Sequence, residues 1–173
     1  MSGYVRRALV AGLAAAFTFA ALWWATAALG WVREDRPVES VLVARPDLVS
    51  YRLTWRGDTL QVEVLPGPGV DLPELYTSLH RQLEAVLGSR AFTLRVQDRR
   101  DATLQEAMRT MRLYLEEALV NGRFSWADQM VREIATRRGL DWARVSVDTD
   151  YVYVELRHGP AYLYEVVRRS GTQ

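Results

Sequence analysis

Two turns divide the stretch from Val145 to Val167, VSVDTDYVYVELRHGPAYLYEVV, into three strand-like runs. Side chains of a strand alternate between two faces, so every second residue of each run lies on the same face. Pairing Val147 with Val152 brings the aliphatic side chains of the first two runs together and sets Arg144 opposite Glu155. The pattern predicts a three-stranded antiparallel meander.

The turn around HGPA decides how the third run pairs with the second. A loop of two or four residues keeps Ala161, Leu163 and Val167 on the aliphatic face, whereas a three-residue loop would mix tyrosines into it. We therefore predict the even loop. The opposite face of the meander then carries four tyrosines, which are Tyr151, Tyr153, Tyr162 and Tyr164.

This tyrosine face is the candidate interaction site of the sequence. Tyrosine offers a large amphipathic contact area at a low entropy cost, so we predict that the face binds a protein partner or a second copy of the chain. Two alternatives stay open. Tyrosine is also a good strand former on a half-exposed face, and the C-terminal tail or another element is able to cover the rings.

A second pair of alternating runs, VSYRLTWRGDTLQVEV at residues 49–64, predicts a hairpin. Placing Trp55 opposite Leu60 also sets Arg52 opposite Glu63, so one register explains both an apolar face and a charge pair. On the first strand the apolar face is expected to carry Val49, Tyr51, Leu53 and Trp55.

Apolar residues at helical spacing predict three helices after this hairpin, with one further strand at residues 92–96. The helix starts are expected at capping pairs: Asp71 with Glu74, Thr103 with Glu106, and Ser125 with Asp128. The resulting order is β-β-α-β-α-α-β-β-β. We expect an α+β fold, a small sandwich of antiparallel or mixed sheet with the helices packed on one face around one core.

A run of 25 uncharged residues, 8–32, precedes this domain. As a helix it would be about 37 Å long, enough to cross a hydrocarbon core of about 30 Å with some tilt. Trp31 and the charges from Arg33 onward mark its end. The run predicts a transmembrane signal-anchor helix in the lipid bilayer; the alternative is a signal peptide cleaved after Ala27 or Ala28.

The expected organisation of the chain follows from this run. It comprises a basic tail (1–7), the anchor (8–32), a linker (33–47), the α+β domain (48–168) and a C-terminal tail (169–173). The linker contains a candidate edge strand at residues 38–43. The short basic start and the absence of cysteine favour an extracytoplasmic domain on a single-pass protein of the bacterial cell membrane. Within the anchor, small residues recur every fourth position and predict a packing ridge of Ala8, Gly12, Ala16 and Ala20.

Composition narrows the function classes. Two of the 22 basic residues precede the uncharged run, and the other 20 follow it together with all 21 acidic residues. The part of the chain after the run is therefore nearly neutral. This balance argues against nucleic-acid binding. The sequence has no lysine and no cysteine, which excludes Schiff-base lysine chemistry, thiol catalysis and zinc sites built on cysteine.

No catalytic, cofactor or metal constellation is predicted from motif spacing. His80 and His158 lack a second histidine at ligand spacing, and the acidic pair in Asp148–Asp150 is more typical of a turn than of a cation site. We therefore predict a non-enzymatic, anchored interaction or envelope-assembly module. The alternatives are an anchored sensor that binds a small ligand and a hydrolase using carboxylates such as Asp98, Asp148 and Asp150.

Overall fold

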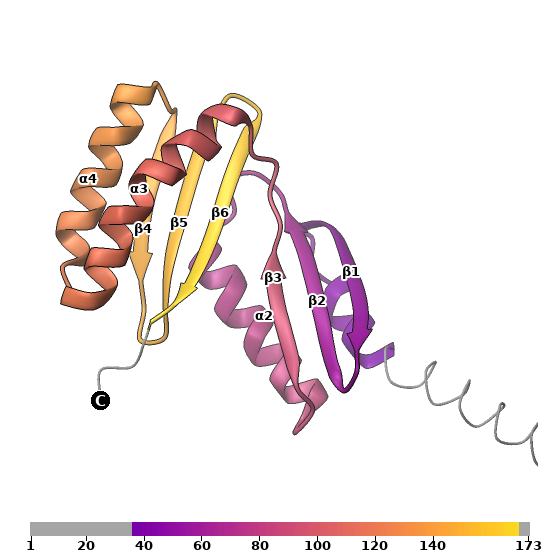
Figure 1. Ribbon diagram of the computed structural model, residues 1–173. Helices are drawn as coiled ribbons and strands as arrows, with labels where there is room; N and C mark the ends of the chain where they lie inside the picture. Colours follow the sequence, from indigo (N-terminus) through magenta and orange to yellow (C-terminus); the bar gives the residue numbers. More distant parts are fainter. Residues whose placement is uncertain (1–35, 170–173) are drawn as a thin grey trace, which may run out of the picture. The chain divides into compact units, whose positions relative to one another are not determined.

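The computed structural model describes residues 36–169, which form an α+β protein with four helices and two three-stranded sheets (Figure 1). A short helix over residues 36–43 comes first. The elements that follow are β1 (Leu48–Arg56), β2 (Thr59–Pro66), α2 (Leu72–Leu87), β3 (Phe92–Val96), α3 (Ala102–Asn121), α4 (Phe124–Arg138), β4 (Trp142–Val147), β5 (Tyr151–His158) and β6 (Ala161–Arg168). This series confirms the predicted order. All the labelled elements belong to one compact unit that begins at Leu42.

The first sheet has the order β1-β2-β3. Its hairpin has the predicted register, with Trp55 paired to Leu60 and Arg52 to Glu63. A register shift between Leu48 and Ser50 marks a bulge, and it leaves Val49 exposed rather than on the apolar face. β3 pairs with β2 in the parallel direction, so the α2 crossover returns the chain to the same sheet.

The second sheet, β4-β5-β6, is the predicted antiparallel meander. Val147 pairs with Val152 and Arg144 with Glu155, as expected. His158 pairs with Ala161 across the two-residue loop, which confirms the even turn. Gly159 has a φ of 55° in this loop, a conformation that glycine adopts without the steric penalty of a side chain.

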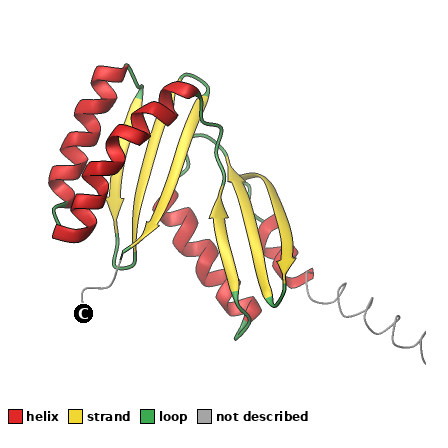
Figure 2. Ribbon diagram, in the orientation of Figure 1, coloured by secondary structure: helices red, strands yellow, loops and turns green. Residues whose placement is uncertain are grey.

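The aliphatic face of the second sheet packs against α3 and α4 (Figure 2). The two helices supply most of the buried core, and β5 and β6 add Val154, Leu156 and Leu163, all fully buried. This part of the core agrees with the sequence prediction, because helix stripes and aliphatic strand faces share it.

The prediction of one sandwich with helices on one face is too simple. β3 joins β2 instead of the meander, so the strands separate into two sheets. The segment after β3 meets the second sheet at Arg99 and Tyr162, whose backbone groups exchange two hydrogen bonds of 3.2 and 3.1 Å. α2 contacts β5 on the face opposite α3 and α4, since its Tyr76 ring meets Tyr151 and Tyr153.

Residues 38–43 are helical, so the candidate edge strand is wrong. Val38 and Leu42, four residues apart, lie on the same side of a helix and both are buried. The sequence interpretation mistook this helical spacing for strand character because the segment is short.

Two helix starts also differ from the predicted caps. α3 begins one residue after Asp101, whose carboxylate accepts a hydrogen bond of 2.8 Å from the Leu104 amide, so Asp101 replaces Thr103 as the cap. α4 begins before Ser125 at Phe124, and no side chain of the described chain caps it. For α2, Asp71 accepts from the Glu74 amide as predicted.

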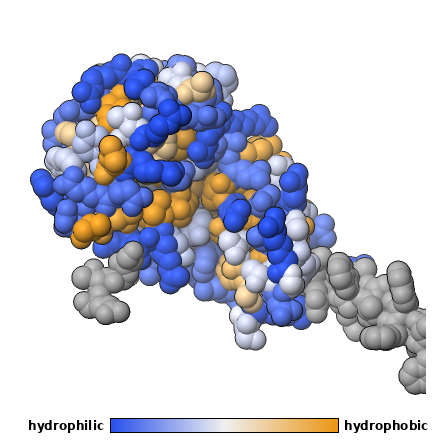
Figure 3. Space-filling view, in the orientation of Figure 1, coloured by the Kyte–Doolittle hydropathy of each residue, from blue (hydrophilic) through white to orange (hydrophobic). Residues whose placement is uncertain are grey.

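The anchor at residues 8–32, including Ala8, Gly12, Ala16 and Ala20, lies outside the described residues. Within residues 36–169, none of the helices combines the length and the apolar character that a membrane span requires. Figure 3 shows a surface that is largely hydrophilic and is interrupted by small apolar areas. Seven large apolar side chains of the described residues are exposed: Val43, Val49, Val86, Leu113, Val120, Trp142 and Val147.

Candidate functional site

The tyrosine face of the meander is covered by the segment that connects β2 to α2. The Tyr162 hydroxyl donates a hydrogen bond of 2.8 Å to the carbonyl of Pro66, and the Tyr164 hydroxyl donates one of 3.0 Å to the carbonyl of Gly67. The Gly69 amide in turn donates to the Tyr164 hydroxyl at 3.1 Å. The two hydroxyls therefore fasten the connecting segment to β6.

Tyr76 of α2 covers the other end of the same face. Its ring lies edge-on to Tyr151, with centroids 4.9 Å apart, and also edge-on to Tyr153 at 6.0 Å. Burial raises the pKa of Tyr76 and of Tyr153 above the ordinary tyrosine value, and Tyr153 also donates to Asp148 at 2.6 Å. Both phenols are therefore neutral hydrogen-bonding groups of the core.

These contacts bury most of the tyrosine face. Tyr153, Tyr162 and Tyr164 are buried and Tyr151 is partly buried. A partner surface needs accessible rings, so the observation that supported a protein-interaction role is lost for the three buried tyrosines. Of the two alternatives that the sequence left open, coverage by another element is the one observed.

The tyrosine face continues past the tyrosines into a cavity. Cross-strand pairing sets Trp142 opposite Arg157 and Arg144 opposite Glu155, while Glu155 is also opposite Tyr164. Since facing residues share a side of the sheet, all five project to the side that the connecting segment covers. The sheet thus places two arginines, a carboxylate and two aromatic rings together.

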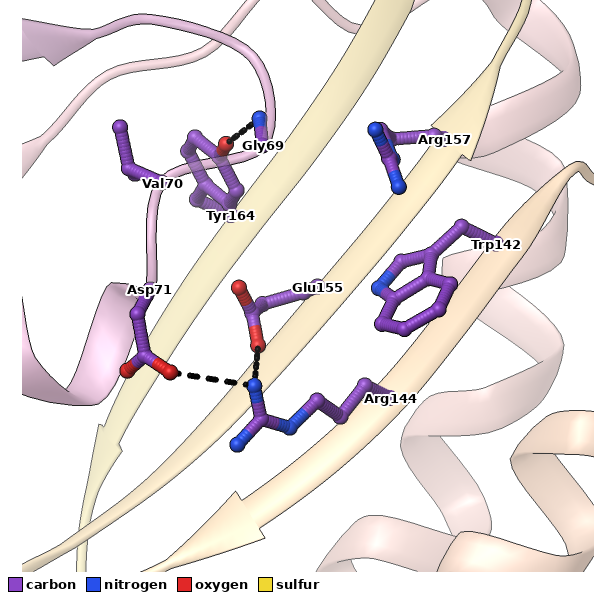
Figure 4. Close-up of a pocket in the computed structure, with 8 residues that line it drawn as sticks. All are labelled: Gly69, Val70, Asp71, Trp142, Arg144, Glu155, Arg157 and Tyr164. Carbon is purple, nitrogen blue, oxygen red and sulfur yellow. Dashed lines mark hydrogen bonds and ion pairs between the residues drawn. The ribbon is translucent and has the colours of Figure 1, made fainter.

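The cavity has a volume of about 120 Å³ and is shown in Figure 4. Three strands supply one wall and the connecting segment supplies the other. Its lining residues are Gly69–Asp71, Trp142, Arg144, Glu155, Arg157 and Tyr164. Trp142, one of the lining residues, is 45% exposed, so the cavity is accessible from solvent.

Glu155 is the buried charge of this cavity, with 5% of its surface exposed. Its Oε1 accepts a hydrogen bond of 3.4 Å from the Leu72 amide at the start of α2. Its Oε2 is buried and has no hydrogen-bond donor among the described residues. Burial raises the pKa of Glu155, opposed by the Leu72 amide and by the charges of Arg144 and Arg157, while Asp71 adds to the increase.

The two arginines of the cavity have different partners. Arg144 Nη1 lies 3.3 Å from Asp71 Oδ2 and 3.7 Å from Glu155 Oε2, so it forms an ion pair with each carboxylate. Arg157 stacks on Trp142, with its guanidinium carbon 5.3 Å from the ring centroid. In the described part of the chain Arg157 makes no ion pair.

The carboxylates named for the hydrolase hypothesis lie outside this cavity. Asp98 accepts hydrogen bonds from Arg100 and from the Tyr164 amide. Asp148 Oδ1 accepts from the amides of Asp150 and Tyr151, which makes the acidic pair a turn. Asp98 and Asp148 therefore have partners within the fold, and none of the three carboxylates lines this cavity.

The two histidines also have local partners. His80 on α2 lies 3.5 Å from Glu84 and meets the Phe92 ring, while His158 Nδ1 lies 2.6 Å from Asp101 Oδ2. Within residues 36–169 no group of three or more acidic or histidine side chains is arranged to hold a metal ion.

Sequence reasoning paired Arg144 with Glu155 but missed the site that they help to form. The sequence does hold a signal for this site. Every second residue of the strand lies on one face, so Tyr151 and Tyr153 are followed on that face by Glu155 and Arg157. A carboxylate in line with large aromatics, at the centre of a three-stranded sheet, marks a charge that the fold must bury. The covering segment could not be inferred from the alternation.

No protein-family model, curated protein or solved structure matches the chain.

Proposed function

We propose that this protein is a membrane-tethered binding domain that holds a small polar ligand in the cavity beside Glu155. The observation that carries the proposal is the buried Oε2 of Glu155, which has no hydrogen-bond donor among the described residues. A buried acceptor without a donor costs about 1–3 kcal/mol, and more when it is charged. A ligand that donates to this oxygen would recover that free energy.

Two further features support a ligand site. Arg157 offers guanidinium N–H groups beside the cavity, held in place by stacking on Trp142. The half-exposed Trp142 offers an apolar surface at the rim. A concave site with a few convergent polar groups and a perturbed carboxyl pKa is typical of small-molecule binding.

The tether is the uncharged run at residues 8–32, which is long enough to cross a bilayer. The proposal places the domain outside the cytoplasm, because a short basic start followed by an apolar run has the order of a signal sequence and the chain has no cysteine. An anchored binding domain would sense or retain its ligand at the membrane surface. In this proposal the cavity takes the role that the sequence assigned to the tyrosine face.

A stabilisation screen tests the proposal. The full chain in detergent micelles is heated with a set of small acids, amines, amino acids and sugars, and the unfolding midpoint is recorded. We expect at least one compound to raise the midpoint of the wild type but not that of Trp142→Ala, whose side chain lines the cavity. A screen in which no compound acts, or in which Trp142→Ala responds equally, would refute the proposal.

A further inference from the structure

Glu155 and Arg157 present opposite charges to the cavity from the same strand. They are two residues apart on β5, so their Cα atoms are about 6.8 Å apart and both side chains lie on one face. Glu155 Oε2 lacks a hydrogen-bond donor and Arg157 lacks an ion pair, each within the described residues. Figure 4 shows both side chains at the cavity, with no interaction drawn between them.

The charges around the cavity disfavour a ligand that carries only negative or only positive charge. A simple anion that binds Arg157 would place negative charge near Glu155 and Asp71. A simple cation that binds Glu155 would face Arg144 and Arg157. A molecule with a carboxylate and a nitrogen donor a short distance apart satisfies both the guanidinium of Arg157 and the Glu155 oxygen that lacks a donor, since guanidinium binds carboxylate through paired N–H donors.

The volume of the cavity limits the ligand. The cavity encloses about 120 Å³. This space suits a few non-hydrogen atoms and is well below the volume of a drug-sized site. Because Trp142 at the rim is 45% exposed, a longer molecule is able to extend from the cavity into solvent.

We infer, on the basis of the proposed function, that the cavity binds an α-carboxylate whose α-carbon carries a nitrogen donor. A small free amino acid and the C-terminal residue of a peptide share this chemistry. The carboxylate binds the guanidinium of Arg157, and the nitrogen donates a hydrogen bond to Glu155 Oε2. Arg144 lies 3.7 Å from the same Glu155 oxygen, and its ion pair with Asp71 holds it there.

Calorimetric titration of the full chain in detergent micelles at pH 7 tests this inference with four probes. Alanine carries both groups, N-acetylalanine carries the carboxylate with an amide N–H, alaninamide lacks the carboxylate, and propionate lacks the nitrogen. We expect alanine or N-acetylalanine to bind at least about tenfold more tightly than alaninamide and propionate, because each control loses a charge-assisted contact. Binding of N-acetylalanine would indicate a peptide end, and binding of alanine alone a free amino acid.

Variants connect the binding to the two side chains. Arg157→Gln and Glu155→Gln should each weaken binding of the preferred probe about tenfold or more, whereas Arg56→Gln, at the end of β1 and away from the cavity lining, should not. Having two cavity variants keeps the test decisive if one of them does not fold, as judged by circular dichroism.

Several results would overturn the inferred ligand class. Propionate or alaninamide binding as tightly as alanine would remove the need for one of the two groups. Unchanged affinity in both cavity variants, or no heat from any of the four probes, would also refute it. In each case the proposed function would survive if another compound of the wider screen stabilised the wild type and not Trp142→Ala, so the two failures are distinguishable.

Discussion

Arg144 Nη1 lies 3.7 Å from Glu155 Oε2, within the range of an ion pair but too far for a hydrogen bond. The same nitrogen lies closer to Asp71, at 3.3 Å. Arg144 therefore compensates the charge of Glu155 without occupying its second oxygen. This relationship leaves Oε2 of Glu155, a residue that lines the cavity, without a hydrogen-bond donor among the described residues, and the account of ligand binding depends on it.

Glu155→Gln should change how stability depends on pH. Burial raises the pKa of Glu155, so the folded state holds this proton more tightly than the unfolded state. Its ionisation therefore lowers the free energy of unfolding as the pH rises from its ordinary pKa near 4.5 through the raised folded value. Chemical denaturation at several pH values should show this decrease in the wild type and not in Glu155→Gln. Parallel curves for the two proteins would contradict the assignment.

Tyr162→Phe should lower the free energy of unfolding by about 1–3 kcal/mol, because the buried carbonyl of Pro66 loses its donor. The matched control is Tyr114→Phe. Tyr114 is partly buried against Trp126, and in the described part of the chain its hydroxyl has no hydrogen-bond partner. Urea denaturation should show a change below about 0.5 kcal/mol for this control. Equal losses in both variants would disprove the role given to the Tyr162 hydroxyl.

Tyr153 and Asp148 should be coupled in a double-mutant cycle. Burial alone would raise the pKa of Asp148, but hydrogen bonds from the Tyr153 hydroxyl and two backbone amides lower it below its ordinary value. Tyr153→Phe and Asp148→Asn should therefore show a coupling free energy of about 1–3 kcal/mol at pH 7. This contribution should disappear as the pH falls through the lowered pKa of Asp148. Additive effects at pH 7 would contradict the contact.

Gly69→Ala should both destabilise the protein and weaken the site. Gly69 has a φ of 84°, a backbone conformation that costs about 1–2 kcal/mol for a residue with a side chain. The methyl group of the alanine variant would lie 3.5 Å from Arg157 Nη1. Gly57→Ala, with a φ of 59° and no atom within 4 Å, is the control for strain without the contact. We expect similar losses of stability from both, but weaker binding of the preferred probe only for Gly69→Ala. The same loss of binding in Gly57→Ala would argue against a local effect.

The anchor predicts how the chain fractionates. The full chain should remain in membranes after alkaline washing, and Leu13→Arg with Phe17→Arg should reduce insertion, since each arginine near the centre of a span costs about 2.5–3.5 kcal/mol. N-terminal sequencing should find residues that precede the run. A mature protein that begins at Ala28 or Leu29 would show instead that the run is a cleaved signal peptide.

Local patterns predicted the strands and their registers because a strand with one buried face fixes its own pairing. The hairpin around Trp55 and Leu60 and the meander around Val147 and Val152 have the predicted pairs for this reason. Helix starts were less certain, because Asp101 and Thr103 are both suitable caps and only the path of the chain selects between them.

The partition into two sheets and the position of the cavity depend on contacts between distant residues. Tyr162 and Pro66 are 96 positions apart, and their hydrogen bond belongs to the cover that buries the tyrosine face. Alternation showed that the four tyrosines share a face, but it could not show whether water, a partner or the chain itself covers them. The same limit hid the cavity, because its second wall is the segment at Gly69–Asp71.

The most direct test of the central claim is an intermolecular nuclear Overhauser measurement between bound ligand and protein. The full chain in micelles is saturated with whichever of alanine and N-acetylalanine binds more tightly. The account predicts contacts from the ligand methyl and α-protons to the indole of Trp142, which are lost in Arg157→Gln. Contacts at saturation that avoid Trp142, or that persist unchanged in Arg157→Gln, would contradict the claim that this cavity is the binding site.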